Sequence, residues 1–210
     1  MVLASASAGM ATLMWINEKT RSHHAAVDAS WLDLLVPAVT AADYRRQLVH
    51  VYGFEAPLEA ALAATPLLGS TAELQRRARS GLLAQDLLAL QYTPAQLAAL
   101  PQCRIASFRG VAEALAWMYV MERSTSLHSP VQRHLTSRMP ELASACSYLT
   151  TSGRLVTSRW DELGLMLDTV ARSSQIHEQI LAATQDAFRC AIDWFHGADP
   201  ASAVEQAALH

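Results

Sequence analysis

Lysine is almost missing from this sequence of 210 residues, in which Lys19 is the only one. The sixteen basic residues are outnumbered by nineteen acidic ones, which gives a net charge of −3. No run rich in Lys and Arg is present, so the sequence lacks the positive surface of a nucleic-acid-binding protein, and we expect no nucleic-acid partner. No stretch reaches the ~18 uninterrupted apolar residues of a transmembrane helix, so no membrane partner is expected either.

Cysteine is scarce as well. The three cysteines, Cys103, Cys146 and Cys190, lie far apart and are odd in number, which matches neither a disulfide framework nor a zinc pattern. We expect ordinary thiols in a reducing compartment. No basic residue precedes Lys19, so the apolar N-terminus lacks the charged start of a secretory signal. These features predict a soluble, cytoplasmic protein.

Helical periodicity is abundant, and 51% of the residues are hydrophobic, which is enough for a sizeable core. The pattern predicts an all-α, single-domain fold over residues 12–197, with an N-terminal extension (1–11) and a C-terminal tail (198–210). The predicted helices are 12–28, 40–64, 71–91, 94–100, 107–124, 130–138, 158–173 and 175–196. Thr40 and Thr71 are the expected N-caps of the second and third helices. The longest segment predicted to be non-helical is 147–158.

The first predicted helix carries a histidine on its buried face. At 100° per residue its core-facing stripe consists of Leu13, Ile16, Thr20, His24, Val27 and Trp31. Asp28 follows His24 by four residues, which is close enough on a helix for side-chain contact. Two interpretations fit this pattern. His24 is either a core histidine satisfied by a local acceptor, or a metal or haem ligand whose ring the carboxylate of Asp28 orients.

Several stretches, taken in order, resemble the haem oxygenase family. The segment 16–28 (INEKTRSHHAAVD) resembles the proximal helix of these enzymes, in which a Thr precedes the iron-binding His by four residues. Thr20 and His24 match that spacing, and Asp28 matches the acidic position that follows. Further matches are YRRQLVHVYGFEAPLEAAL (44–62) and LLAQDLLALQ (82–91), which resemble the bacterial, phytochrome-associated branch, together with AWMYVMERST (116–125) and AATQDAFRCAIDWF (182–195).

The resemblance implies a haem-oxygenase-like helical bundle that binds haem as both cofactor and substrate. It implies His24 as the iron ligand and Thr20 and Asp28 as residues of the haem site. The implied reaction is oxidative opening of haem to biliverdin, iron and carbon monoxide, with electrons from an external donor of the ferredoxin or flavoprotein reductase type. A phytochrome or another signalling protein is an implied partner.

The segment that matches the family's distal helix departs from the pattern. The family reads approximately EGSxLGG, whereas this sequence reads ERSTSLH from Glu122 to His128. The three glycines, which allow the helix to lie close to the haem, are replaced by Arg123, Leu127 and His128. Ser124 stands where some members hold an aspartate that organises distal water, so it is the candidate catalytic residue. Such a helix must stand back from the haem or block the oxygen site.

This departure leaves two alternatives to an active enzyme. One is a non-catalytic haem-binding or haem-sensing protein whose distal site is blocked or ligated by His128. The other is a haem-free, partner-binding remnant of the fold. His128 itself is expected either to be a solvated residue at a helix end or to act as a second iron ligand.

The basic residues of the sequence are assigned more simply. Arg76, Arg77 and Arg79 are expected on a solvated helix face, and the alternative is a patch that binds a redox partner. Asn17 falls where the family often has a lysine that binds the haem propionates, and Arg21 or Arg159 are the candidate substitutes.

Overall fold

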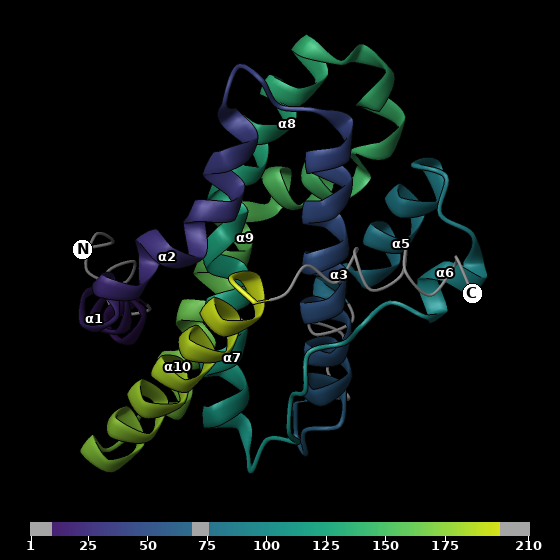
Figure 1. Ribbon diagram of the computed structural model, residues 1–210. Coiled ribbons are helices and arrows are strands. Elements are labelled where there is room, and N and C mark those ends of the chain that lie inside the picture. Colours follow the sequence, from purple (N-terminus) through teal and green to yellow (C-terminus); the bar gives the residue numbers. More distant parts are fainter. Residues whose placement is uncertain (1–9, 69–75, 198–210) are drawn as a thin grey trace.

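The computed structural model describes residues 10–68 and 76–197. In these ranges it contains helices and no strand, which confirms the all-α prediction (Figure 1). The first half of the chain forms α1 (Ala11–Lys19), α2 (Arg21–Leu32), the 3-10 helix η2 (Asp33–Leu35), α3 (Ala41–Ala63), α5 (Ser80–Ala89) and α6 (Pro94–Ala98). The second half forms α7 (Val111–Arg123), η3 (Ser124–Leu127), α8 (His128–Arg138), η4 (Pro140–Ala145), α9 (Ser147–Val170) and α10 (Ser174–Phe195).

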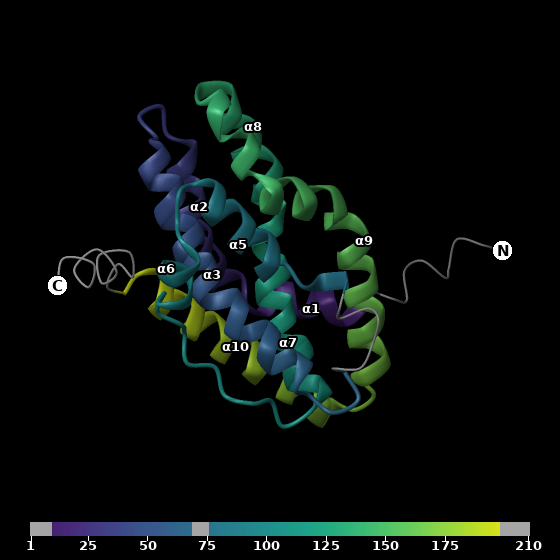
Figure 2. The ribbon, with the colours of Figure 1, turned by 90° about the vertical axis from the view of Figure 1, so that its right-hand side faces the viewer.

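Helix α7 lies at the centre of the bundle, where it contacts α10, α9 and α3 (Figures 1 and 2). Helix α2 packs against both α10 and η3, and α8 packs against α9. This arrangement brings the predicted proximal helix directly onto the predicted distal segment. Among the described residues, no helix combines the length and the apolar character that crossing a membrane requires.

Helix α3 connects two clusters of buried apolar side chains. Its second half contributes Phe54, Leu58 and Leu62 to a cluster with α7 and α10. Its first half contributes Tyr44 and Leu48 to a cluster with α5, α8 and the start of α9. Thr40 is the N-cap as predicted, and it forms a capping box: its side chain accepts a hydrogen bond from the Asp43 backbone N–H, and the Asp43 carboxylate accepts one from the Thr40 backbone N–H.

The helix predicted over 12–28 is two helices, which meet at Thr20. The Thr20 hydroxyl donates to the Ile16 carbonyl at 2.8 Å, a bond within the helix that favours bending. The predicted stripe nevertheless holds, since Leu13, Ile16, Thr20, Val27 and Trp31 are buried. His24 is only partly buried.

The prediction that residues 147–158 are non-helical is wrong, because they form the first half of α9. Their Ser, Thr and Gly residues have low intrinsic helix propensity, but Tyr148, Leu149 and Ser152 are fully buried in the bundle. The free energy of packing these side chains outweighs the weak local preference.

The helix predicted over 71–91 is interrupted in the described residues, where 76–77 are helical and 78–79 are not. Helix α5 starts at Ser80, and the expected cap Thr71 lies outside the described residues. The carboxylate of Glu59, on α3, accepts hydrogen bonds from the backbone N–H groups of Arg79 and Ser80 at 2.5 and 3.1 Å. A residue distant in sequence therefore caps this helix.

Candidate functional site

His24 lies on α2, where its ring packs against the Phe188 ring of α10 with 5.6 Å between centroids. Its Nε2 atom is 3.3 Å from the hydroxyl of Thr20. Burial lowers the pKa of His24 to about 4, and the positive charges of Arg123, His23 and Arg21 act in the same direction. The imidazole is therefore neutral at neutral pH, which is the form that binds a metal. Thr20 and His24 lie as close together as their spacing predicts.

Asp28 does not orient the His24 ring as the four-residue spacing suggested. Its carboxylate binds the Arg123 guanidinium in a bidentate pair, with Nη2–Oδ2 and Nη1–Oδ1 distances of 2.8 and 3.3 Å. Burial raises the pKa of Asp28, although Arg123 opposes that shift. Because Asp28 is on α2 and Arg123 ends α7, the pair ties the predicted proximal helix to the predicted distal segment.

His128 is completely buried at the start of α8, so the expectation of a solvated residue at a helix end is wrong. Its ring lies between those of Trp31 and Tyr148, with 4.8 Å between centroids on each side. Neither ring nitrogen has a hydrogen-bond partner in the described part of the chain. Burial lowers the pKa of His128 well below its usual value, and the charges of Arg79 and Arg159 add to this effect. His128 is thus a neutral core residue held by two aromatic rings.

The bend between α7 and α8 is formed without glycine. Residues Ser124–Leu127 adopt a 3-10 turn, in which three successive hydroxyls donate to carbonyls three residues earlier. The bonds run from Ser124 to Met121 at 3.3 Å, from Thr125 to Glu122 at 2.6 Å and from Ser126 to Arg123 at 3.3 Å. The hydroxyl of Ser124, the candidate catalytic group, is therefore bonded within its own turn. Leu127 packs against the core cluster of α3, α5 and α8.

Little space remains where α2, α3, α7, η3 and α10 meet. A cavity of about 20 Å³ lies there, and its walls are Val27, Trp31, Val51, Phe54, Glu55, Val120, Met121, Ser124, Ala191 and Phe195. This volume holds about one water molecule, whereas small-molecule pockets occupy ~300–1,000 Å³. Side chains therefore fill the interior between the predicted proximal and distal segments.

A buried ion cluster adjoins this cavity through Glu55. The Arg79 guanidinium lies 2.9 Å from Glu55 and 3.4 Å from Glu122, and the Arg77 guanidinium lies 3.2 Å from Glu122. The Tyr148 hydroxyl donates to Glu55 at 2.7 Å. Burial raises the pKa of Glu55 to about 7.

The expectation that Arg76, Arg77 and Arg79 form a solvated face is wrong for two of them. Arg77 and Arg79 are 1% and 0% exposed, because carboxylates on neighbouring helices attract them inward. Arg77 pairs with Glu122 and Glu162. Arg79 pairs with Glu55 and Glu122. The sequence held a signal for this cluster. Glu55 and Glu122 interrupt otherwise apolar helix faces, and an internal carboxylate needs a cationic partner.

The candidate propionate-binding residues are engaged elsewhere or exposed. Asn17 accepts a hydrogen bond from the Tyr119 hydroxyl at 3.1 Å. Arg159 is buried beside Glu122 and donates to the Arg76 carbonyl at 3.0 Å. Arg21 is exposed and lies 3.9 Å from Glu18. Of the three, Arg159 is buried, whereas Asn17 on α1 and Arg21 on α2 are exposed.

The family model for haem (heme) oxygenase matches residues 11–197. The chain therefore belongs to the haem oxygenase family. The match covers nearly the whole chain of 210 residues, and the all-α bundle agrees with it. No curated protein and no solved structure matches the chain.

Membership of this family implies haem as substrate and a reductase as electron donor. The space between α2 and η3, which we call the cleft, can therefore be tested for its fit to haem. On the α2 side, a neutral His24 beside Thr20 has the chemistry of an iron ligand. On the opposite side, Arg123 spans the space to Asp28, and His128 packs against Trp31. The residues as packed do not fit a haem.

Proposed function

We propose that this protein is a haem oxygenase family member that does not cleave haem. The observation that carries this proposal is the Arg123–Asp28 ion pair, which crosses from the distal segment to the proximal helix at 2.8 Å. A porphyrin between these segments requires several hundred Å³, and about 20 Å³ is present. Opening haem to biliverdin also requires room for dioxygen, and Leu127 and His128 add side chains at that position.

Replacement of the family's glycines accounts for this closed cleft. A glycine at position 123 has no side chain that could reach α2, whereas arginine is long enough to bind Asp28. A carboxylate that is partly buried on α2 gains a cationic partner from this replacement, and bidentate Arg–carboxylate pairs are among the stronger hydrogen-bonded contacts. The ferredoxin or flavoprotein reductase implied by the family then has no bound haem to reduce.

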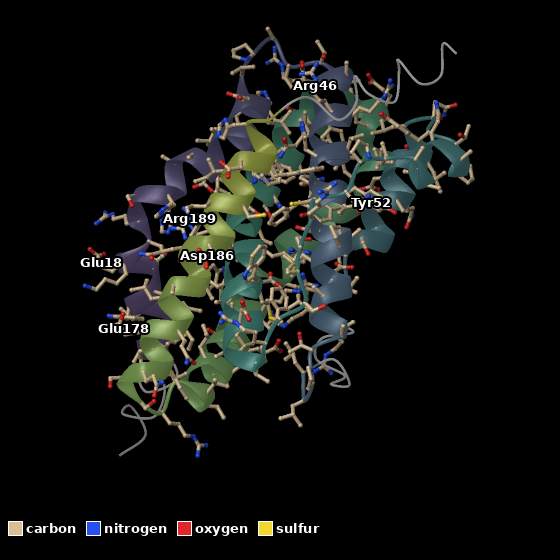
Figure 3. All side chains as sticks on the ribbon, turned by 60° about the horizontal axis from the view of Figure 1, so that its bottom comes forward. Glu18, Arg46, Tyr52, Glu178, Asp186 and Arg189 are labelled. Atoms are coloured by element: carbon tan, nitrogen blue, oxygen red, sulfur yellow. The ribbon has the colours of Figure 1, made fainter. Side chains whose placement is uncertain are left out.

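The role we propose for such a chain is to bind another protein through its folded helical domain. A phytochrome or another signalling protein is the partner that the sequence resemblance favours. A groove of about 410 Å³ opens on the surface between η2, α3 and the end of α10, and Asp33, Val36, Asp43 and Arg46 lie along it. Figure 3 shows Arg46 at the outer surface of α3. This groove is the surface on which we propose that the partner binds.

The deciding experiment combines haemin titration with a turnover assay. Purified protein is titrated with haemin, and then supplied with ferredoxin, its reductase and NADPH under air while biliverdin is measured by its absorbance. We expect no biliverdin. Arg123→Gly should increase haemin affinity at least about tenfold by removing the bridge to Asp28, whereas Arg109→Gly, at a side chain that is 90% exposed, should not. Biliverdin formation by the unaltered protein would refute the proposal.

A second candidate function is haem binding without cleavage, which the neutral and partly exposed imidazole of His24 favours. In this case haemin binds with one-to-one stoichiometry, His24→Ala abolishes the iron spectrum, and the neighbouring His23→Ala leaves it unchanged. A low-spin spectrum that becomes high-spin in His128→Ala would add His128 as the second ligand. An unchanged spectrum in that variant would exclude His128 from the iron.

A further inference from the structure

Two of the three cysteines lie side by side in the fold. Cys103 belongs to the segment between α6 and α7, and Cys190 lies on α10, yet their sulfur atoms are 3.5 Å apart. Both are free thiols in the structure. We infer that Cys103 and Cys190 form a redox-active pair, which closes to an intramolecular disulfide when the protein meets a small disulfide such as oxidised glutathione. This inference does not depend on the proposed function.

The pair is held together by a tight junction of three segments. The Cys103 backbone N–H donates to the Gly53 carbonyl of α3 at 2.7 Å. A Cβ atom at Gly53 would lie 2.6 Å from both the Pro101 carbonyl oxygen and the Trp194 ring, so only glycine allows this approach. The Trp194 indole N–H in turn donates to the His50 carbonyl at 2.8 Å, which ties α10 to α3. The two thiols are therefore positioned by the backbone around them rather than by chance contact of mobile side chains.

The two thiols differ in access, and this difference sets the order of the chemistry. Cys190 is partly exposed, whereas Cys103 is 8% exposed. The thiolate of Cys190 attacks one sulfur of the small disulfide, forms a mixed disulfide and releases one glutathione thiolate. Cys103 then loses its proton and attacks the Cys190 sulfur, which releases the second glutathione. The two protein thiols together lose two electrons and two protons, and the small disulfide is reduced to two thiols.

Closure needs only a small movement. The sulfur atoms must approach from 3.5 Å to the ~2.05 Å of a disulfide, which side-chain rotation and a slight shift of the segment around Cys103 can supply. The hydrogen bond from the Cys103 thiol lowers the pKa of Cys190, which favours the thiolate there. Cys146 is 1% exposed in the other core cluster and has no part in this junction.

The position of the pair gives the disulfide a structural consequence. Ala191, next to Cys190, lines the cavity beside the closed cleft, and Phe188 packs on His24 from the same helix. Arg189, on the other side of Cys190, lies on the outer face of α10 (Figure 3). A bond from Cys190 to Cys103 would therefore fix α10 against the rest of the bundle at the level of the cleft.

The experiment uses the unaltered full chain in buffers with increasing ratios of oxidised to reduced glutathione. We expect intact mass to fall by about 2 Da, and a non-reducing peptide map to link Cys103 to Cys190 while Cys146 stays open to alkylation after unfolding. The oxidised protein should melt roughly 5–10 °C higher, because the bond closes a long loop. Cys146→Ala should behave like the unaltered protein.

Three results would overturn the inference. One is a glutathione adduct that persists on Cys190 of the unaltered protein without ring closure. The second is a disulfide that includes Cys146 or joins two chains. The third is a mass that does not change under strongly oxidising buffers. Cys103→Ser supplies the complementary measurement, since it should accumulate the mixed disulfide on Cys190. The unaltered protein decides the outcome even where a variant folds poorly.

Discussion

Replacing Arg79 by methionine perturbs the buried ion cluster most directly. The Arg79 side chain is 0% exposed, and its guanidinium lies between Glu55 at 2.9 Å and Glu122 at 3.4 Å. It also donates to the Met121 carbonyl at 3.3 Å. Methionine fills most of the same volume without charge. The substitution therefore leaves Glu55 without its cation and Glu122 with only the arginines that remain beside it.

Breaking a buried ion pair by removing one partner costs about 3–5 kcal/mol, because the other charge stays buried and uncompensated. We expect a loss of that size in the free energy of unfolding, and a melting temperature lower by roughly 10 °C. The loss should be smaller in acid. Glu55 has a pKa of about 7 in the fold, and near pH 5 it is protonated and needs no cation.

Urea unfolding followed by far-UV circular dichroism at about pH 8 and about pH 5 measures both effects. Arg109→Met is the matched control, because the Arg109 side chain is 90% exposed in its pair with Glu113 and should matter by less than ~1 kcal/mol. A loss below about 1 kcal/mol in Arg79→Met at both pH values would show that the cluster is not the buried network described above.

Three further predictions concern single positions. Burial raises the pKa of Glu55 from 4.5 to about 7, so the fold binds a proton that the unfolded chain releases; this stabilisation is complete below pH 4.5 and is lost as the pH rises through 7. Glu55→Gln should therefore remove a decline of about 3 kcal/mol in unfolding free energy between those pH values, and an unchanged slope would refute this assignment. Gly53→Ala should destabilise the protein by about 1–3 kcal/mol in urea unfolding, because the added Cβ collides with the Pro101 carbonyl oxygen. Gly81→Ala is the control and should be neutral or stabilising, because the space around its Cβ is open. Equal effects of the two substitutions would contradict the close approach at Gly53. Thr40→Ala should cost about 1 kcal/mol by removing the N-cap of α3, and Thr40→Ser should restore most of it; a loss shared by both variants would exclude the cap as the cause.

Local patterns predicted the helices wherever local and tertiary preferences agree. Thr40 begins α3 as expected, because its capping box depends only on residues three apart. Thr20 and His24, four residues apart, lie within 3.3 Å of each other, as neighbours on one helix face do. The prediction for the first half of α9 was wrong because most of its residues are polar. Its helical structure depends on the burial of Tyr148 and Leu149 against helices that are distant in sequence.

Local sequence patterns could not predict that side chains fill the space between α2 and η3, for a related reason. The resemblance predicted that Arg123 and His128 stand where the family has glycines, but it did not predict where their side chains lie. Asp28 was expected to contact His24, one turn away on the same helix, and instead binds an arginine 95 residues further along the chain. The neighbouring positions of Cys103 and Cys190 likewise depend on how α10 packs against α3, which spacing along the chain does not record.

The hydroxyl-bonded turn of η3 has a consequence for engineering this family. The hydroxyl groups of Ser124, Thr125 and Ser126 fix the path of the backbone between α7 and α8. The corner between these helices therefore does not depend on glycine. Glycines can then be introduced at positions 123, 127 and 128 one at a time, while the serine and threonine bonds preserve the corner. This chain is thus a starting point for measuring how much space between α2 and η3 the removal of side chains alone creates, independently of helix shape.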